Sequence, residues 1–189
     1  GGHLSLAVIE GMLDALVESE GEPDLVQLSG GEPTLHPQFF EILDAVKRRP
    51  IRHVMINTNG LRIAQEPAFV DRLASYAPRL EVYLQFDSMD DDALMNLRGA
   101  RLSRIRQAAL EQLERVGLST TLVAVVKRGV NDHEVAAIVD HALDWSCVRG
   151  VTFQPVQDAG RNEGFDAKAN RILLSQIRRE VVKAGVFGA

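Results

Sequence analysis

The sequence predicts an α/β fold in which helices cover a parallel sheet. Five short runs rich in apolar and β-branched residues alternate with amphipathic helical patterns, as in proteins built from consecutive β/α units. The centres of these runs lie 28 to 39 residues apart, which is the length of one strand with its crossover helix. The runs are almost continuously apolar, as expected for strands whose two faces are both covered.

The first two helices have clear amino-terminal signals. Apolar residues recur at three- and four-residue intervals over residues 6–17, and Ser5 before them is a suitable N-cap. A first strand is expected over residues 24–29. The next helix is expected over residues 39–46 and is entered through Pro37, because proline suits the first turn of a helix.

The same alternation continues to the end of the chain. We expect, in order, strand 52–57, helix 67–76, strand 80–86, helix 105–116, strand 119–126, helix 135–143, strand 148–154 and helix 173–182. Gly117 is placed to end the helix before it, and residues 131–134 resemble a capping box. Eight β/α units need about 250 residues. A chain of 189 residues is therefore expected to be one domain, residues 1–189, whose opening helix indicates a missing first strand and loop.

The composition excludes several classes of function. The 21 Lys and Arg residues and 26 Asp and Glu residues give a formal charge of -5, which argues against nucleic acid as a partner. No apolar run is long enough for a transmembrane segment, and the start is unlike a signal peptide, so a cytoplasmic protein is expected. The single cysteine, Cys147, cannot form an intramolecular disulfide or by itself an iron–sulfur site; a buried inert thiol is the better explanation.

Candidate functional residues lie where the expected strands end, because parallel β/α folds bind ligands at that edge. Gly30 and Gly31 follow the first strand and allow a sharp turn and close approach of a ligand to the main chain. Glu32 comes next and would repel phosphate but favour an ammonium group. A plain glycine-rich turn is an equally good explanation of the pattern by itself.

The other strand ends are also polar, and each has a simpler structural explanation. Residues 57–60 suit a tight turn. The acidic residues within 87–92 could bind a divalent cation, but acids that cap a helix are commoner. Lys127 or Arg128 could pair with a carboxylate, or the segment could only shape a turn. The last strand ends in residues 154–158.

As a set, these strand ends resemble the radical S-adenosylmethionine (radical SAM) superfamily. The motifs that carry the resemblance are residues 29–33, 58–60, 85–87 with 97–99, and 128–132, in that order. The similarity covers about residues 4–161, with Gly160 and Arg161 at its end, and is greatest to the branch of tetraether lipid synthases and the wider molybdenum cofactor biosynthesis protein A group. It implies a partial TIM-type (β/α)6 barrel, here without its first strand and cluster loop.

The resemblance also implies a binding site for S-adenosylmethionine (SAM) at the strand ends. The residues implied are Gly30, Gly31, Glu32 and Pro33 for the methionyl amino group, Thr58, Asn59, Gln85 and Asp87 near the ribose and methionyl moiety, Arg128 as a carboxylate partner, and Asn131, Gln154 and Pro155 beside the adenine.

The function implied by the resemblance is that of a radical SAM enzyme. In the intact protein a [4Fe–4S] cluster, reduced by an external electron donor, would pass one electron to SAM. This would cleave SAM to methionine and a 5′-deoxyadenosyl radical, which takes hydrogen from a small-molecule or lipid substrate. Family members hold the cluster with a C-x3-C-x2-C loop that this sequence lacks. Truncation before Gly1 is favoured over natural loss, and the polypeptide as given is expected to be inactive.

Two alternatives stay open at this stage. One is a cluster-free module that binds SAM or a nucleotide at the mouth of the barrel. The other is an aldolase-type or phosphate-using (β/α) domain, for which the sequence offers neither a convincing Schiff-base lysine nor a phosphate loop.

Overall fold

The computed structural model describes residues 2–156 and 166–185 of the chain. Its centre is a five-stranded sheet in the order β1-β2-β3-β4-β5, in which every neighbouring pair is parallel. The strands are β1 (Leu25–Leu28), β2 (His53–Thr58), β3 (Leu80–Gln85), β4 (Thr120–Val126) and β5 (Val148–Pro155). The expected parallel α/β arrangement is confirmed. Gly160 and Arg161 lie outside the described residues.

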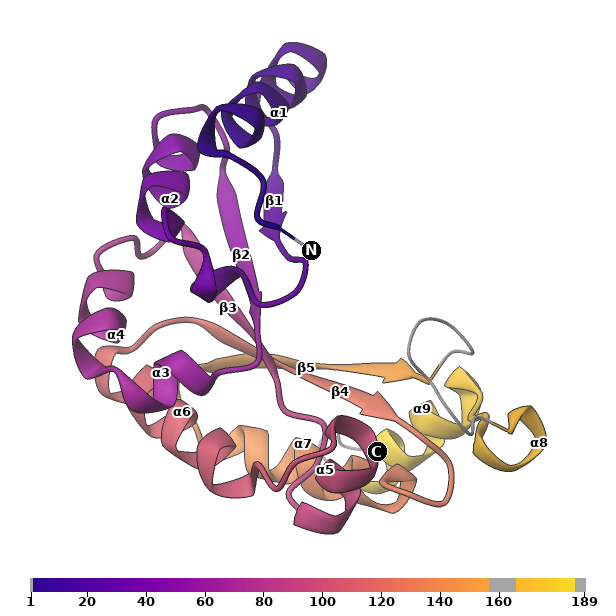
Figure 1. Cartoon of the computed structure of the whole chain (residues 1–189). Helices are drawn as coiled ribbons and strands as arrows, with labels where there is room; N and C mark the ends of the chain where they lie inside the picture. The colour runs from indigo at the N-terminus through magenta and orange to yellow at the C-terminus, as the bar shows by residue number, and fades with distance from the viewer. Residues whose placement is uncertain (1, 157–165, 186–189) are drawn as a thin grey trace.

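Helices connect each strand to the next along the sheet (Figure 1). They are α1 (Leu6–Glu20), α2 (Phe39–Lys47), α3 (Leu61–Gln65), α4 (Pro67–Ala74), α5 (Asp91–Arg98), α6 (Ser103–Val116), α7 (Val135–Leu143), α8 (Ala167–Asn170) and α9 (Leu174–Lys183), with 3-10 turns η1 (Pro33–Leu35) and η2 (Asp132–Glu134). Among these described helices, none combines the length and the apolar character needed to cross a bilayer.

The helix boundaries follow the expected signals at most positions. The Ser5 side chain accepts a hydrogen bond from the backbone N–H of Val8 at 3.4 Å, and Gly117 ends α6 at φ +65°. The short helices α3, α5 and α8 were not predicted. Asp90 caps α5 by accepting from the backbone N–H of Ala93 at 3.0 Å, so an acid of this segment does cap a helix.

The prediction of a capping box at residues 131–134 is wrong. No side chain caps α7. The Asn131 side chain accepts a hydrogen bond from the backbone N–H of Lys127 at 2.8 Å, and the Glu134 carboxylate accepts from the Ser88 hydroxyl. Both polar groups are buried. Residues at the ends of neighbouring strands therefore make the hydrogen bonds that a capping box would otherwise use.

The two faces of the sheet differ in character. Alternate residues such as Val54, Ile56, Leu80, Val82 and Leu84 are buried against helices on the convex side of the curved sheet, which Figure 1 shows along its left and lower edges. The intervening residues of β2 and β3 point to the other side and are only half-buried, whereas Thr121 and Val123 of β4 are buried. The prediction that both faces are covered therefore holds for most of β4 and is wrong for the other strands.

Cys147 lies before β5, at the end of the sheet opposite to the carboxyl ends of the strands. Its side chain is buried, and burial, together with a hydrogen bond to Glu114, raises the pKa of the thiol to about 12. A thiol that stays protonated is a poor nucleophile and a poor metal ligand. The expectation of a buried, inert cysteine agrees with this environment.

Candidate functional site

Glu32 joins the loop after β1 to the end of β2. Its Oε1 accepts hydrogen bonds from the hydroxyls of Thr34 and Thr58, both at 2.7 Å, and from the backbone N–H of Thr34 at 3.2 Å. Its Oε2 accepts from the backbone N–H of Asn59 at 2.7 Å. A carboxylate oxygen accepts more than one hydrogen bond, so Oε2 retains capacity for a further donor such as an ammonium group.

The two glycines before Glu32 leave the main chain open to a ligand. Gly30 has a φ of +137°, a conformation that side chains with a Cβ rarely adopt. A Cβ placed on Gly30 or on Gly31 would meet no atom within 4 Å. The N–H and C=O groups of this loop can therefore be approached closely by a bound molecule.

The end of β2 uses its polar groups to shape the next turn. The buried Thr58 hydroxyl donates to Glu32 and accepts from the backbone N–H of Gly60 at 3.2 Å. The Asn59 side chain accepts from the backbone N–H of Leu61 at 3.0 Å. Thr58 and Asn59 are thus in direct contact with the Glu32 loop, as their predicted shared site requires, but their side chains already bind the protein.

Gly60 is tightly enclosed, and its replacement by alanine tests how firmly this turn is held. Gly60 has a φ of +75°, and an added Cβ would lie 2.6 Å from Leu84 Cδ1. Overpacking at such a position costs about 1–3 kcal/mol, in addition to the strain of a positive φ. We expect Gly60→Ala to lower the free energy of unfolding in urea by at least about 2 kcal/mol.

Gly99→Ala is the matched control for Gly60→Ala. Gly99 has nearly the same φ, +73°, but an added Cβ there would meet nothing within 4 Å. It should show only the conformational cost of about 1 kcal/mol. Equal losses of stability in the two variants would contradict the tight enclosure of Gly60.

Asp87 lies behind the strand ends rather than on the open side of the sheet. It is fully buried, has a φ of +62°, and accepts two hydrogen bonds of 2.7 Å from the Arg98 guanidinium and one of 3.1 Å from the backbone N–H of Val125. Its pairing raises the pKa of Arg98. The carboxylate that was predicted near the ribose is therefore occupied in joining β3 to β4.

Asn131 completes the same connection. Its side-chain N–H groups donate to the carbonyls of Asp87 at 2.8 Å and Val125 at 2.7 Å. It is fully buried. The structure brings Asp87 and Asn131 together, in a network that positions the strand ends and offers no exposed polar atom to the adenine.

Arg106, on α6, is a member of this network that sequence reasoning missed. It donates to the carbonyl of Asn59 and its guanidinium lies 3.9 Å from the Asp87 carboxylate. Burial lowers the pKa of Arg106 to about 10, and its Nε has no partner among the described residues. The available signal was an arginine within the buried stripe of α6, which also contains Ala109, Leu110 and Leu113.

The remaining predicted residues are spread over the sheet. Gln85 donates to the Asn57 side chain at 3.3 Å on the half-buried face. Gln154 is exposed and Pro155 is half-buried at the end of β5. Arg128 donates to Gln176 of α9 at 2.9 Å, so its guanidinium is directed toward the carboxyl-terminal helices. Pro33 begins the turn η1 directly after Glu32.

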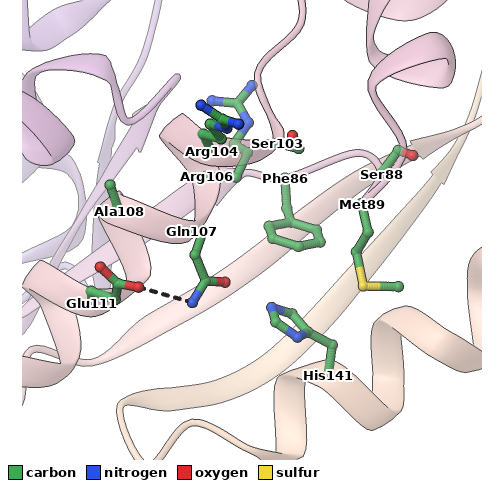
Figure 2. Close-up of a pocket in the computed structure, with 10 residues that line it drawn as sticks. All are labelled: Phe86, Ser88, Met89, Ser103, Arg104, Arg106, Gln107, Ala108, Glu111 and His141. Carbon is green, nitrogen blue, oxygen red and sulfur yellow. Dashed lines mark hydrogen bonds between the residues drawn. The ribbon is translucent and has the colours of Figure 1, made fainter.

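A separate cavity of about 410 Å³ lies between α6, α7 and the segment after β3 (Figure 2). The rings of Phe86 and His141 are stacked there at a centroid distance of 5.5 Å. Arg106 lines this cavity, but none of the residues assigned to SAM does. It lies on the helix-covered side of the sheet, and Arg106 is the residue that it shares with the network behind the strand ends.

A half-barrel of parallel strands with an acidic, glycine-rich loop at its carboxyl edge defines a class of ligand-binding β/α protein. The family model of the radical SAM superfamily matches residues 1–142. The chain belongs to the radical SAM superfamily, as the sequence motifs implied. The members of this superfamily use SAM and a [4Fe–4S] cluster.

Curated relatives are enzymes of this superfamily. The chain is 33% identical over 168 residues to the 7,8-dihydro-6-hydroxymethylpterin dimethyltransferase of Methanocaldococcus jannaschii. This alignment covers 88% of this chain and 33% of that protein. It is 29% identical over 187 residues to the GTP 3′,8-cyclase of Cronobacter sakazakii, covering 97% of this chain and 54% of that enzyme. The chain therefore spans between a third and about half of the length of these relatives.

Solved structures confirm the partial-barrel fold. A radical SAM methyltransferase from Sphaerobacter thermophilus superposes with a TM-score of 0.65 and 18% identity, over 94% of this chain and 54% of that one. The protein anSMEcpe with bound AdoMet superposes with a TM-score of 0.63 and 17% identity, over 96% of this chain and 51% of that one.

The residues of this chain fit SAM but not the cluster. The Oε2 atom of Glu32 and the open main chain at Gly30 and Gly31 suit an amino-acid moiety. The only cysteine of the sequence is buried, with a raised pKa. Within residues 2–156 and 166–185, no three His, Cys, Asp or Glu side chains are grouped to hold a metal ion. The described residues therefore supply no ligand set for the cluster.

Proposed function

We propose that this chain is the SAM-binding part of a radical SAM enzyme. The observation that carries the proposal is Glu32, a carboxylate held by four hydrogen bonds at the carboxyl edge of the sheet beside an open glycine loop. Bound SAM is the source of the radical in this chemistry. Glu32 binds the methionyl ammonium group, and the main chain of Gly30 and Gly31 orients the amino-acid moiety.

The buried network behind the site keeps the strand ends in register while the ligand binds. Glu32 holds the loops after β1 and β2 together, and Arg106 contacts both Asn59 and Asp87. Asp87 and Asn131 connect the ends of β3 and β4. These residues position the groups that touch SAM, and they act by limiting movement of four neighbouring strand ends.

The finer features of the proposal concern the whole protein. We propose that residues 1–189 form one domain, that the polypeptide by itself does not cleave SAM because it lacks cluster thiolates, and that an external electron donor serves the intact enzyme. A cytoplasmic location, without nucleic acid as a partner, is proposed on the composition. The substrate is a small molecule or a lipid. The relatives named above are a pterin dimethyltransferase and a GTP cyclase, while a lipid is suggested only by the resemblance to tetraether lipid synthases.

Calorimetric titration of SAM into the 189-residue chain tests the proposal. We expect binding of one SAM molecule, and weaker binding of 5′-methylthioadenosine, which has the nucleoside but lacks the amino-acid group that Glu32 receives. The same affinity for both compounds, or no binding of SAM at millimolar concentration, would overturn the assignment of Glu32.

A cluster-free binding module is the second candidate, favoured by the burial and high pKa of Cys147. The coding sequence upstream of Gly1 separates the two candidates. An extended polypeptide that acquires a [4Fe–4S] absorption spectrum on anaerobic reconstitution and cleaves SAM supports the enzyme. An extended polypeptide that binds SAM without acquiring a cluster supports the module.

A further inference from the structure

The face of the sheet opposite to the covering helices, called the inner face below, is polar where a closed barrel would be filled by apolar side chains. Parallel register places residues of neighbouring strands on the same face. The inner-face residues are Leu25, Gln27, His53, Met55, Asn57, Glu81, Tyr83, Gln85, Thr121, Val123, Val125, Gly150, Thr152 and Gln154. Most of them carry hydrogen-bonding groups. The inner face turns away from the helices on the convex side of the sheet (Figure 1).

Two hydroxyls meet in the middle of this face. The Tyr83 and Thr152 oxygens are 2.6 Å apart, across the intervening strand β4. One hydroxyl donates to the other, so the accepting hydroxyl keeps its own O–H for another partner. The pair therefore presents a hydrogen-bond donor beside hydrogen-bond acceptors, and both residues are only half-buried.

The inner face has a space next to these hydroxyls. Gly150 stands opposite Thr121 in the register of β4 and β5, so this inner-face position has no side chain. A Cβ built on Gly150 would meet a single atom within 4 Å, the Thr121 hydroxyl at 3.9 Å. A ligand group can occupy the place that a side chain would otherwise fill.

The charges on the inner face disfavour an anion. Glu81 lies two residues before Tyr83 on the same face, and its carboxylate accepts hydrogen bonds from the Thr121 hydroxyl and from His53 at 3.3 Å. Arg149 is the only Lys or Arg in the five described strands, and it lies in the register shift at the amino-terminal end of β5. A phosphate or carboxylate at the hydroxyl pair would thus face the negative Glu81 carboxylate, and Arg149 is the only Lys or Arg that the described strands supply.

We propose that the Tyr83, Thr152 and Gly150 region of the inner face is a binding site for the substrate, and that the group bound there is a non-anionic polar group with adjacent hydrogen-bond donor and acceptor, such as a cyclic amide. The inference rests on the proposed function, because it places the substrate on the sheet next to SAM. An acyl chain would leave the remaining O–H of the Tyr83–Thr152 pair without an acceptor and would remove water from the Glu81 carboxylate, which is unfavourable. The structure therefore favours a polar small molecule over a lipid as substrate.

Three probes test this assignment on the 189-residue chain saturated with SAM, so that the SAM site is occupied. Guanosine supplies a neutral cyclic amide, guanosine monophosphate adds an anionic group, and n-octanol supplies an alkyl chain. Saturation-transfer NMR should show binding of guanosine, at least tenfold weaker binding of the monophosphate, and no binding of octanol. Stronger binding of octanol than of guanosine would overturn the proposal in favour of a lipid-binding face.

Variants locate the bound probe. Gly150→Val fills the space and Thr152→Val removes one hydroxyl at similar volume, and each should weaken guanosine binding at least tenfold while changing SAM affinity less than twofold. Ser75→Ala is the control, because it removes a hydroxyl that donates to the carbonyl of Arg72 after α4. Unchanged guanosine affinity in both inner-face variants would refute the site.

The outcomes also separate this inference from the proposed function. If the unmodified chain binds SAM but does not bind guanosine, only the inner-face site is contradicted. Failure of the unmodified chain to bind SAM contradicts the proposed function, and guanosine binding that depends on Gly150 and Thr152 would then still support a polar ligand site.

Discussion

Replacing Asp87 by alanine should lower the free energy of unfolding by about 3–5 kcal/mol, the cost of leaving buried charges without their partner. Arg98 loses two hydrogen bonds of 2.7 Å, and Arg106, which is 1% exposed, loses its nearest negative charge. Alanine must also adopt a φ of +62°, which aspartate and asparagine tolerate better. Urea unfolding followed by circular dichroism measures the change.

Two further variants interpret the Asp87 result. Asp87→Asn retains the shape, an acceptor for the Val125 N–H and tolerance of the positive φ, so its loss should be clearly smaller than that of alanine. Asp92→Ala removes the partner of Arg101 in a pair whose side chains are 79% and 63% exposed, and should change stability by less than about 1 kcal/mol. A similar effect of Asp87→Ala and Asp92→Ala would contradict the role of the buried network.

Glu32→Gln should weaken SAM binding about tenfold to hundredfold, as expected when a charge-assisted hydrogen bond becomes a neutral one. The amide has one acceptor oxygen instead of two. It therefore cannot accept from both the Thr58 hydroxyl and the Asn59 backbone N–H, which now bind different oxygens of the carboxylate. Calorimetry with SAM gives the affinity, and urea unfolding gives the accompanying loss of stability.

Thr34→Val separates the charge of Glu32 from its orientation. It removes one hydroxyl that donates to Oε1 at 2.7 Å and leaves the carboxylate in place. We expect a loss of SAM affinity of less than about tenfold. If Thr34→Val weakens SAM as much as Glu32→Gln does, the carboxylate serves to shape the loop and does not bind the ligand directly.

The order of elements could be predicted because each depends on local pattern. Apolar runs gave the five strands, and Ser5 and Gly117 marked helix boundaries that the structure confirms. The short helices α3 and α5 were missed. The first has only five residues, and the second buries only Ala93 and Leu94, so neither shows a distinct apolar stripe.

The direction of polar side chains could not be predicted in the same way. Asp87 and Asn131 follow strands, as ligand-binding residues do, yet both are fully buried and bind other strand ends. Residues that touch a ligand and residues that position the loops occupy neighbouring places in the sequence. Only the path of the backbone, including the positive φ of Asp87, decides which way each side chain points.

The sequence by itself determined the parallel α/β class, the position of the glycine loop, the family, and the lack of thiolates for a cluster. These depend on periodicity, residue type and count, which are properties of short segments or of the whole composition. The tertiary structure decided that Glu32 joins two strand ends, that Arg106 and Arg98 neutralise Asp87, and that the inner face is polar. Each of these depends on contacts between residues 11 to 69 positions apart, whose partners are selected by the register of the sheet and by burial rather than by local pattern.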